Sequence, residues 1–190
     1  MEIKEAVEKY TYADYASWDD DNRYELIDGT VYLLSPGPGT AHQTIIGGLF
    51  NQLYNFLRGK PCSVFCAPFD VCLNGKGDQD TTIVQPDILV LCDKTKLDRK
   101  RCNGAPDMII EILSPSTASR DAILKLDKYL SAGVRECWIV DPDSKNTSVH
   151  VLAGRKYIVE VYSETDTIPV SILEGCLIDM KEVFGEIWPE

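Results

Sequence analysis

Apolar residues form two near-continuous runs near the middle of the chain, at 88–92 and 108–113. Runs of this length without polar alternation are typical of strands that helices cover on both faces. A third strand-like run at 136–140 follows the segment 119–132, where apolar residues recur at helical spacing and which stops at Gly133. The order strand, helix, strand predicts a parallel crossover and therefore an α/β fold.

Shorter signals place further elements around this centre. Asp28-Gly29 lies between two strand-like segments, 24–27 and 30–34, and favours the positive φ angles of a tight hairpin turn. Apolar positions at three- and four-residue spacing predict a helix from Thr40, its expected cap, to about Arg58. We also expect a short helix at 11–18, a strand at 63–73, a mobile or ligand-binding loop at 74–82, and a hairpin of strands at 148–152 and 157–162 that turns at Ala153-Gly154.

The length of 190 residues suits one domain, which we expect to span 1–190, with a core at about 24–142 and a C-terminal hairpin and tail at 143–190. Lys and Arg total 19 against 30 Asp and Glu, so the net charge of −11 argues against a protein that coats nucleic acid. No apolar run approaches the ~18 residues that span a bilayer, and the N-terminus lacks a signal-peptide pattern. We expect a soluble, cytoplasmic protein without membrane contact.

The seven cysteines are scattered without a C-x-x-C pair, and we interpret them as reduced core residues rather than disulfide or metal ligands. Only His42 and His150 are present, which excludes an H-E-x-x-H zinc site. The chain also has no phosphate-binding P-loop and no G-x-S-x-G nucleophile elbow.

Glu111 is a single carboxylate inside an otherwise apolar strand, where an unpaired charge would be costly. Asp87 opens the preceding apolar run, so the two carboxylates meet if these strands pair. Two hard oxygen ligands suit Mg²⁺ or Mn²⁺. The alternative is a buried ion pair between Glu111 and a basic residue such as Arg135 or Lys125.

Several segments occur in an order that carries a family resemblance. They are Tyr24 to Gly29, Ser35-Pro36 with His42, Pro86-Asp87-Ile88, Glu111 to Thr117, Asp121 with Lys125 and Tyr129, Gly133-Val134, and Cys137 to Pro142. Together they resemble the bacterial putative restriction endonuclease family within the PD-(D/E)XK nuclease superfamily. The resemblance implies a restriction-endonuclease-like α/β core, in which helices flank a mixed central sheet, with antiparallel hairpins at the N-terminal and C-terminal ends.

The resemblance also implies roles for individual residues. Asp87 and Glu111 would be catalytic ligands of Mg²⁺ or Mn²⁺. The superfamily lysine normally stands two residues after the second acid, where this chain has Leu113, and the matching lysine is Lys125 on the following helix. Lys128 is a rival for that role, and a solvated surface lysine is the alternative for Lys125.

Three further features bear on substrate binding. Glu25 matches a further site carboxylate by resemblance, although a hairpin glutamate that faces solvent is equally compatible with the pattern. His42, with Gln43, starts the long helix and could contact substrate, or could cap or pack. One basic segment could receive a phosphate backbone or be merely solvated: Lys94, Lys96, Arg99, Lys100 and Arg101.

The leading hypothesis is therefore a metal-dependent endonuclease that hydrolyses DNA. A second hypothesis is a catalytically weak or inactive nuclease-like module for binding or assembly in a mobile element or defence system, which Leu113 and the acidic charge favour. A third is a purely structural role for Glu111. By analogy with nuclease-like domains of this size, a homodimer would suit the two strands of DNA.

Overall fold

The computed structural model describes residues 9–34, 39–114 and 120–185. Two segments of the sequence pattern, Ser35-Pro36 and Pro115 to Thr117, lie outside these residues, as do the side chains of 120–122.

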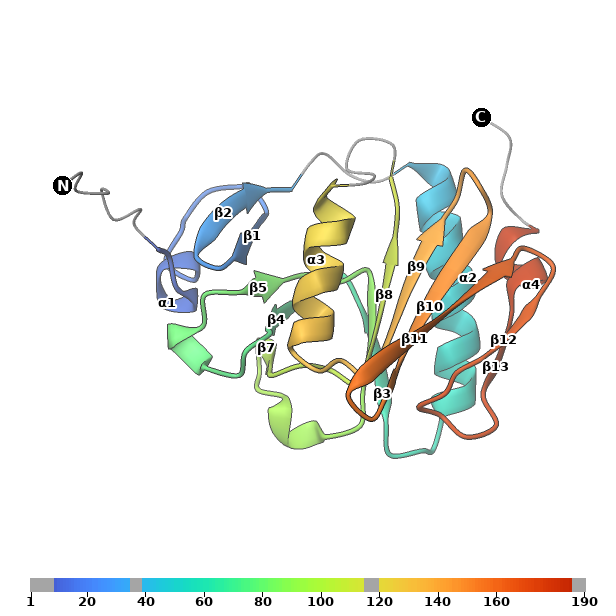
Figure 1. The fold of residues 1–190 in the computed structure, drawn as a ribbon. Coiled ribbons are helices and arrows are strands. Elements are labelled where there is room, and N and C mark those ends of the chain that lie inside the picture. Colours follow the sequence, from blue (N-terminus) through green and yellow to red (C-terminus); the bar gives the residue numbers. More distant parts are fainter. Residues whose placement is uncertain (1–8, 35–38, 115–119, 186–190) are drawn as a thin grey trace.

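A mixed six-stranded sheet forms the centre of the molecule (Figure 1), in the order β11-β10-β9-β8-β6-β3. Its strands are β3 (Ser63–Cys66), β6 (Ile88–Leu91), β8 (Met108–Ile112), β9 (Glu136–Asp141), β10 (Asn146–Ala153) and β11 (Lys156–Ser163). Strands β8 and β9 are parallel and are joined through α3 (Arg120–Ser131), while the other neighbouring strands are antiparallel. The expected parallel crossover and mixed sheet are confirmed.

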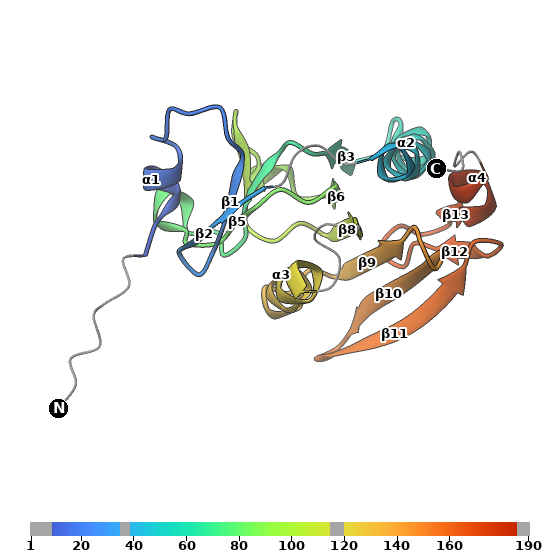
Figure 2. The same cartoon turned by 90° about the horizontal axis from the view of Figure 1, so that it is seen from above.

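Helices cover both faces of this sheet (Figure 2). Alternation along β8 sends Ile110 and Ile112 towards α2 (Thr40–Leu57), and sends Ile109 towards α3. Tyr129 of α3 is fully buried in the apolar core that also contains Ile109. Residues of β8 that precede or follow Ile110 by one position therefore face α3, and Glu111 is one of them.

A second, five-stranded sheet lies on the α3 side, in the order β2-β1-β5-β4-β7. It consists of β1 (Tyr24–Ile27), β2 (Thr30–Leu33), β4 (Asp70–Cys72), β5 (Ile83–Val84) and β7 (Arg101–Asn103). Asp28 and Gly29 turn its first hairpin with φ angles of 53° and 82°, as the sequence predicts. The remaining elements are α1 (Tyr12–Tyr15), η1 (Gly77–Gln79), η2 (Lys94–Lys96), β12 (Thr167–Pro169), β13 (Leu177–Asp179) and α4 (Met180–Phe184).

Some sequence expectations about the elements were wrong. The strand expected at 63–73 is two strands in different sheets, β3 and β4, because Pro68 between them has no N–H for a sheet ladder. Gly39, not Thr40, occupies the cap position of α2. The expected C-terminal tail contains β12, β13 and α4. Their buried apolar residues, such as Ile178 and Phe184, belong to the same apolar core as the buried residues of α2.

The loop at 74–82 is organised around Asp80, whose side chain is fully buried. Its carboxylate accepts hydrogen bonds from the backbone N–H groups of Asn74, Lys76 and Thr82 at 2.9, 3.2 and 2.9 Å. The Asn74 side-chain amide donates a further bond at 2.9 Å. A buried carboxylate with four donors fixes the path of this loop.

The expectation that all cysteines are reduced was wrong for one pair. Cys62 and Cys92 form a disulfide. They flank the paired residues Ser63 and Leu91, so the antiparallel register of β3 and β6 places them opposite each other. Cys66, Cys72, Cys102, Cys137 and Cys176 are free, and all of them except Cys66 are buried as expected.

Strand β10 pairs with β9, so the C-terminal hairpin continues the central six-stranded sheet. This continuity supports a single domain over 1–190, which stays a prediction. Within the described ranges, no helix combines the length and apolar character needed to cross a bilayer.

Candidate active site

Asp87, directly before β6, and Glu111, on the neighbouring strand β8, lie opposite each other. Ile88 of β6 pairs with Ile110 of β8, and the next step of this antiparallel register brings the residue before Ile88 opposite the residue after Ile110. The backbone N–H of Ile112 donates a hydrogen bond of 2.8 Å to Asp87 Oδ2, which fixes this carboxylate at the end of β8. The strand pairing that the sequence argument required is therefore present.

Glu111 is 8% exposed and points into the layer between β8 and α3. Its Oε1 lies 2.8 Å from Lys125 Nζ and accepts a 2.5 Å hydrogen bond from the Tyr129 hydroxyl. Burial raises the pKa of Glu111 to about 7, with Lys125 opposing the rise and the nearby carboxylates of Asp87 and Glu25 adding to it. Glu111 is thus a carboxyl group whose charge is only partly compensated by the protein.

Lys125 reaches the site from α3, and its side chain is 12% exposed rather than solvated. Its Nζ also lies 2.9 Å from Glu25 Oε1. Burial alone would lower the pKa of this ammonium, but Glu111 and Glu25 outweigh burial and raise it. Lys128, the rival in the sequence pattern, instead donates to the exposed carboxylate of Asp28 at 2.6 Å.

Glu25 brings the five-stranded sheet into the site. It lies on β1 and is 4% exposed, so the solvent-facing alternative was wrong. Besides Lys125, its Oε1 accepts a 2.7 Å hydrogen bond from the backbone N–H of Gln85. The Gln85 side chain in turn donates to Asp70 Oδ1 at 2.9 Å and to the Tyr15 hydroxyl at 3.1 Å. These contacts tie the site to the N-terminal part of the chain.

His42 lies beside Asp87 rather than on an open surface. It occupies the first turn of α2, is 8% exposed, and places Nε2 3.3 Å from Asp87 Oδ2. Burial opposes protonation, but the hydrogen bond and the charge of Asp87 outweigh it, so the pKa of His42 is raised. Gln43, its neighbour, is exposed.

Two residues at the site were not singled out from the sequence as site residues. Tyr129 entered only as part of the family pattern, although it stands four residues after Lys125 and therefore on the same helix face. Gln85 gave no sequence signal, because its contribution is a backbone N–H. Arg135, considered as a partner for Glu111, pairs with Asp107 at 3.1 Å instead.

The basic segment lies at the other end of the strands. Asp87 precedes β6, whereas Lys94 follows it, and Lys96 donates to the carbonyl of Ala105, which precedes β8. Arg101 is paired with Asp78 and Asp98 at 2.8 and 3.2 Å. Arg99 and Lys100 are exposed. The structure therefore does not bring this segment to the carboxylates, and its contact with nucleic acid stays a prediction.

The charge balance and donor chemistry of the site fit a divalent cation. The carboxylates of Glu25 and Glu111 share one ammonium group, and the charge of Asp87 also acts on Glu111, which leaves excess negative charge in a buried place. Asp87 and Glu111 offer hard oxygen ligands, and Mg²⁺ typically takes one or two carboxylates together with water and phosphate oxygens. Within the described part of the chain, no group of three or more His, Cys, Asp or Glu residues is arranged as a metal site.

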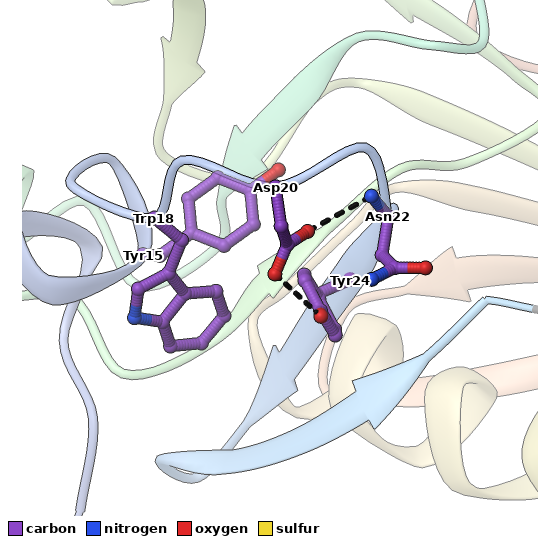
Figure 3. A pocket seen from close by; sticks show the side chains of 5 residues that line it. All are labelled: Tyr15, Trp18, Asp20, Asn22 and Tyr24. Carbon is purple, nitrogen blue, oxygen red and sulfur yellow. Dashed lines mark hydrogen bonds between the residues drawn. The ribbon is translucent and has the colours of Figure 1, made fainter.

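A pocket of about 220 Å³ has none of these carboxylates in its lining (Figure 3). It is lined by Tyr15, Trp18, Asp20, Asn22 and Tyr24, none of which was a predicted site residue. Asp20 accepts hydrogen bonds from the Asn22 backbone N–H and the Tyr24 hydroxyl, both at 2.8 Å. The pocket is connected to the site through Tyr15, whose hydroxyl accepts a hydrogen bond from the side chain of Gln85.

Comparison with known proteins gives a consistent picture of this fold. The family model described as "Putative restriction endonuclease" (Uma2) matches residues 12–181. A crystal structure titled as a putative nuclease belonging to DUF820, from Anabaena variabilis ATCC 29413, matches with a TM-score of 0.73 at 20% identity. The match covers 92% of this chain and 97% of that one, and it shows that the two share a fold.

Similar sequences match more partially. An uncharacterized protein of Synechocystis sp. is 28% identical over 116 residues, which are 60% of this chain and 58% of that protein. Phosphoenolpyruvate carboxylases of Pectobacterium atrosepticum and Yersinia pseudotuberculosis are 27% and 31% identical over 101 and 91 residues. Those segments are 52% and 48% of this chain but 11% and 10% of the carboxylases, so the chain spans less than two thirds of each of these relatives.

Proposed function

This chain belongs to the family described as "Putative restriction endonuclease", and from this premise we propose that it is a Mg²⁺- or Mn²⁺-dependent endonuclease that hydrolyses phosphodiester bonds of DNA. One observation carries the proposal: the Lys125 ammonium is shared by the carboxylates of Glu111 and Glu25, and Asp87 is bound to the backbone N–H of Ile112, the residue after Glu111. Two acids can hold a divalent cation and a lysine can stabilise developing negative charge, which are two contributions that favour phosphodiester hydrolysis.

Lys125 acts as a cation in this proposal, not as a base. Its raised pKa keeps the ammonium protonated throughout the physiological range. A fixed positive charge stabilises the negative charge that develops on phosphate oxygens in the transition state, most strongly in a site that excludes water. Glu111 and Glu25 hold the ammonium from two sides, so it meets the phosphate without first being oriented.

Tyr129 and His42 position the acids. The pKa of Tyr129 is raised well above its usual value by burial and by Glu111, so the phenol stays neutral and keeps donating to Glu111 Oε1. His42 Nε2 and the Ile112 N–H contact the same oxygen of Asp87, which restricts the rotation of this carboxylate. Restricted acids bind a ligand at a smaller entropic cost.

Asp87 and Glu111 are the residues that would hold the divalent cation. When bound, Mg²⁺ or Mn²⁺ supplies positive charge to the phosphate and lowers the pKa of an attacking water. The cation would also offset the excess negative charge of the three carboxylates, of which Glu111 already has a pKa of about 7 in their presence.

A nuclease-like module that binds or assembles without hydrolysis is the second candidate. It is favoured by Leu113 at the usual lysine position and by the net charge of −11, which weakens attraction to DNA. In that case Lys125, Glu111 and Glu25 form a buried ion network that stabilises the fold. We also propose a cytoplasmic location, which is compatible with a DNA substrate, and a homodimer, which would present two sites to a duplex.

A plasmid cleavage assay distinguishes the candidates. Supercoiled DNA is incubated with the wild type in Mg²⁺, in Mn²⁺ and in EDTA, beside Asp87→Asn and Glu111→Gln. Asp78→Asn is the matched control, because this exposed carboxylate pairs with Arg101 away from the site. The endonuclease predicts metal-dependent nicking that both site variants abolish and the control retains. Absent nicking, with DNA binding unchanged in Asp87→Asn, would support the binding module instead.

A further inference from the structure

Strand β11 forms an open edge of the six-stranded sheet. Figure 2 shows it as the outermost strand, and within the described residues β10 is the one strand that pairs with it. All eight of its residues are at least partly exposed. Ile158, Val159 and Val161 are 57%, 52% and 68% exposed, which is unusual for β-branched apolar side chains on both faces of one strand.

Most of the usual protections of an edge strand are missing here. Strand β11 pairs with β10 residue by residue, from Asn146 with Ser163 to Ala153 with Lys156, so no bulge bends it away from a partner. It contains no proline, and its charges are limited to Lys156 and Glu160. Long, regular and apolar edges of this kind readily pair with another chain.

The sequence of β11 is complementary to itself. In a two-fold pair of antiparallel strands, opposite residues share a face, so one residue must lie opposite its own copy. With Ile158 at that centre, Lys156 lies opposite the partner's Glu160 on both sides of the axis. A register centred on Glu160 would oppose two like charges, which destabilises a strand pair. A register centred on Val159 leaves both charges without an opposite charge.

We propose that β11 is the interface of a homodimer, in which the β11 strands of two copies pair antiparallel with Ile158 opposite the partner's Ile158. The two six-stranded sheets then join into one continuous sheet. The axis runs perpendicular to this sheet and keeps its faces, so α3 of both copies lies on the same side. If the proposed nuclease function holds, both candidate sites serve one duplex from one side, but the interface itself does not depend on that function.

Sedimentation equilibrium of the full chain tests the interface. The wild type is expected at twice the mass of one chain at micromolar concentration. Ile158→Arg places two cations opposite each other at the axis and should give a folded monomer with the circular dichroism spectrum of the wild type, and its melting temperature should fall only by the stabilisation that association supplies. Leu177→Arg is the control, because Leu177 is similarly exposed, at 62%, but lies on β13. A monomeric wild type, or a dimer that survives Ile158→Arg, would overturn the proposal.

Charge reversal and cross-linking test the register. Lys156→Glu alone should weaken the dimer at least tenfold, and Lys156→Glu combined with Glu160→Lys should restore it. Under mild oxidation, Ile158→Cys should form a covalent dimer that the wild type and Val161→Cys do not form, since Val161 lies away from the axis. Equal cross-linking of the two cysteine variants, or no rescue by the double reversal, would reject this register. Neither result depends on nuclease activity.

Discussion

Lys125 Nζ lies 2.8 Å from Glu111 Oε1, with both side chains buried between α3 and the six-stranded sheet. For such a pair, replacing both partners and removing only one of them have very different effects on stability. It contributes little net stability relative to apolar side chains, yet removal of one partner leaves the other charge buried alone. Variants of this pair therefore change stability and activity together, and every test of catalysis needs a folding measurement beside it.

Replacement of Lys125 should show this directly. Lys125→Met leaves Glu111 and Glu25 without their shared cation and should lower the free energy of unfolding by about 3–5 kcal/mol, with loss of cleavage. Lys128→Met is the matched control on the same helix, because its exposed pair with Asp28 is worth at most about 1 kcal/mol. Urea denaturation measures both. Equally small losses of unfolding free energy in the two variants would show that Lys125 is not the central cation of the site.

Tyr129→Phe removes one hydroxyl and little volume. The hydrogen bond to Glu111 is lost, and bonds to charged groups contribute about 1.5–3 kcal/mol, so a loss of that size in unfolding free energy is expected. The dependence of cleavage on metal concentration should shift to higher concentration, because Glu111 is less well oriented. Tyr54→Phe, at a half-exposed ring, should change neither measurement. If the metal dependence of cleavage is unchanged in Tyr129→Phe, Tyr129 does not position Glu111 for metal binding.

The stability of the protein should depend on pH through Glu111. Its pKa is raised from 4.5 to about 7, so the folded state binds this proton more tightly than the unfolded chain does. The resulting stabilisation is complete below the unfolded pKa and is lost as the pH rises through about 7. The free energy of unfolding of the wild type should therefore fall by up to about 3 kcal/mol more than that of Glu111→Gln between about pH 5 and pH 8.

The comparison with Glu111→Gln is needed because His42 acts in the same direction. The pKa of His42 is also raised, mainly by Asp87 and to a smaller extent by Glu111, so its contribution is likewise lost with rising pH and is largely retained in Glu111→Gln. Parallel stability profiles of the two proteins, measured by urea denaturation across this range, would contradict the assigned titration of Glu111.

Asp80→Asn tests the loop at 74–82. In the wild type, backbone N–H groups donate to both carboxylate oxygens of Asp80. The asparagine amide keeps one acceptor oxygen but presents its NH₂ group to the other donors. We expect a loss of about 2–4 kcal/mol in unfolding free energy, since buried donors are left unsatisfied. Asp78→Asn, two residues earlier and exposed, should lose less than about 1 kcal/mol. Similar melting temperatures for the two variants would contradict this account.

Much of the central sheet was predictable because its signals are local. The apolar runs of β6 and β8 and the Asp28-Gly29 turn each express a preference that a few residues determine. Glu111 was also conspicuous in the sequence, since it is a charged residue within an apolar strand. The five-stranded sheet was not predicted as a unit, because β5 and β7 are only two and three residues long and depend on their neighbours.

Other features depended on contacts between distant segments. The pairing of Cys62 with Cys92 follows from the register of β3 with β6, which no spacing rule supplies. The burial of Glu25 depends on α3, whose lysine reaches it from the other side of the site. Helical geometry placed Tyr129 beside Lys125, but its hydroxyl became significant only once Glu111 was known to lie within reach.

Glu25 and Lys125 are 100 residues apart in the chain, and this separation has a consequence for synthesis on the ribosome. The acid of β1 leaves the exit tunnel long before α3 is translated, so a nascent or truncated chain that ends before α3 carries the acids without their lysine. Such a chain lacks the cation that the proposed hydrolysis requires. A chain that ends before α3 would therefore not cut DNA, because the last group of the proposed site is delivered late.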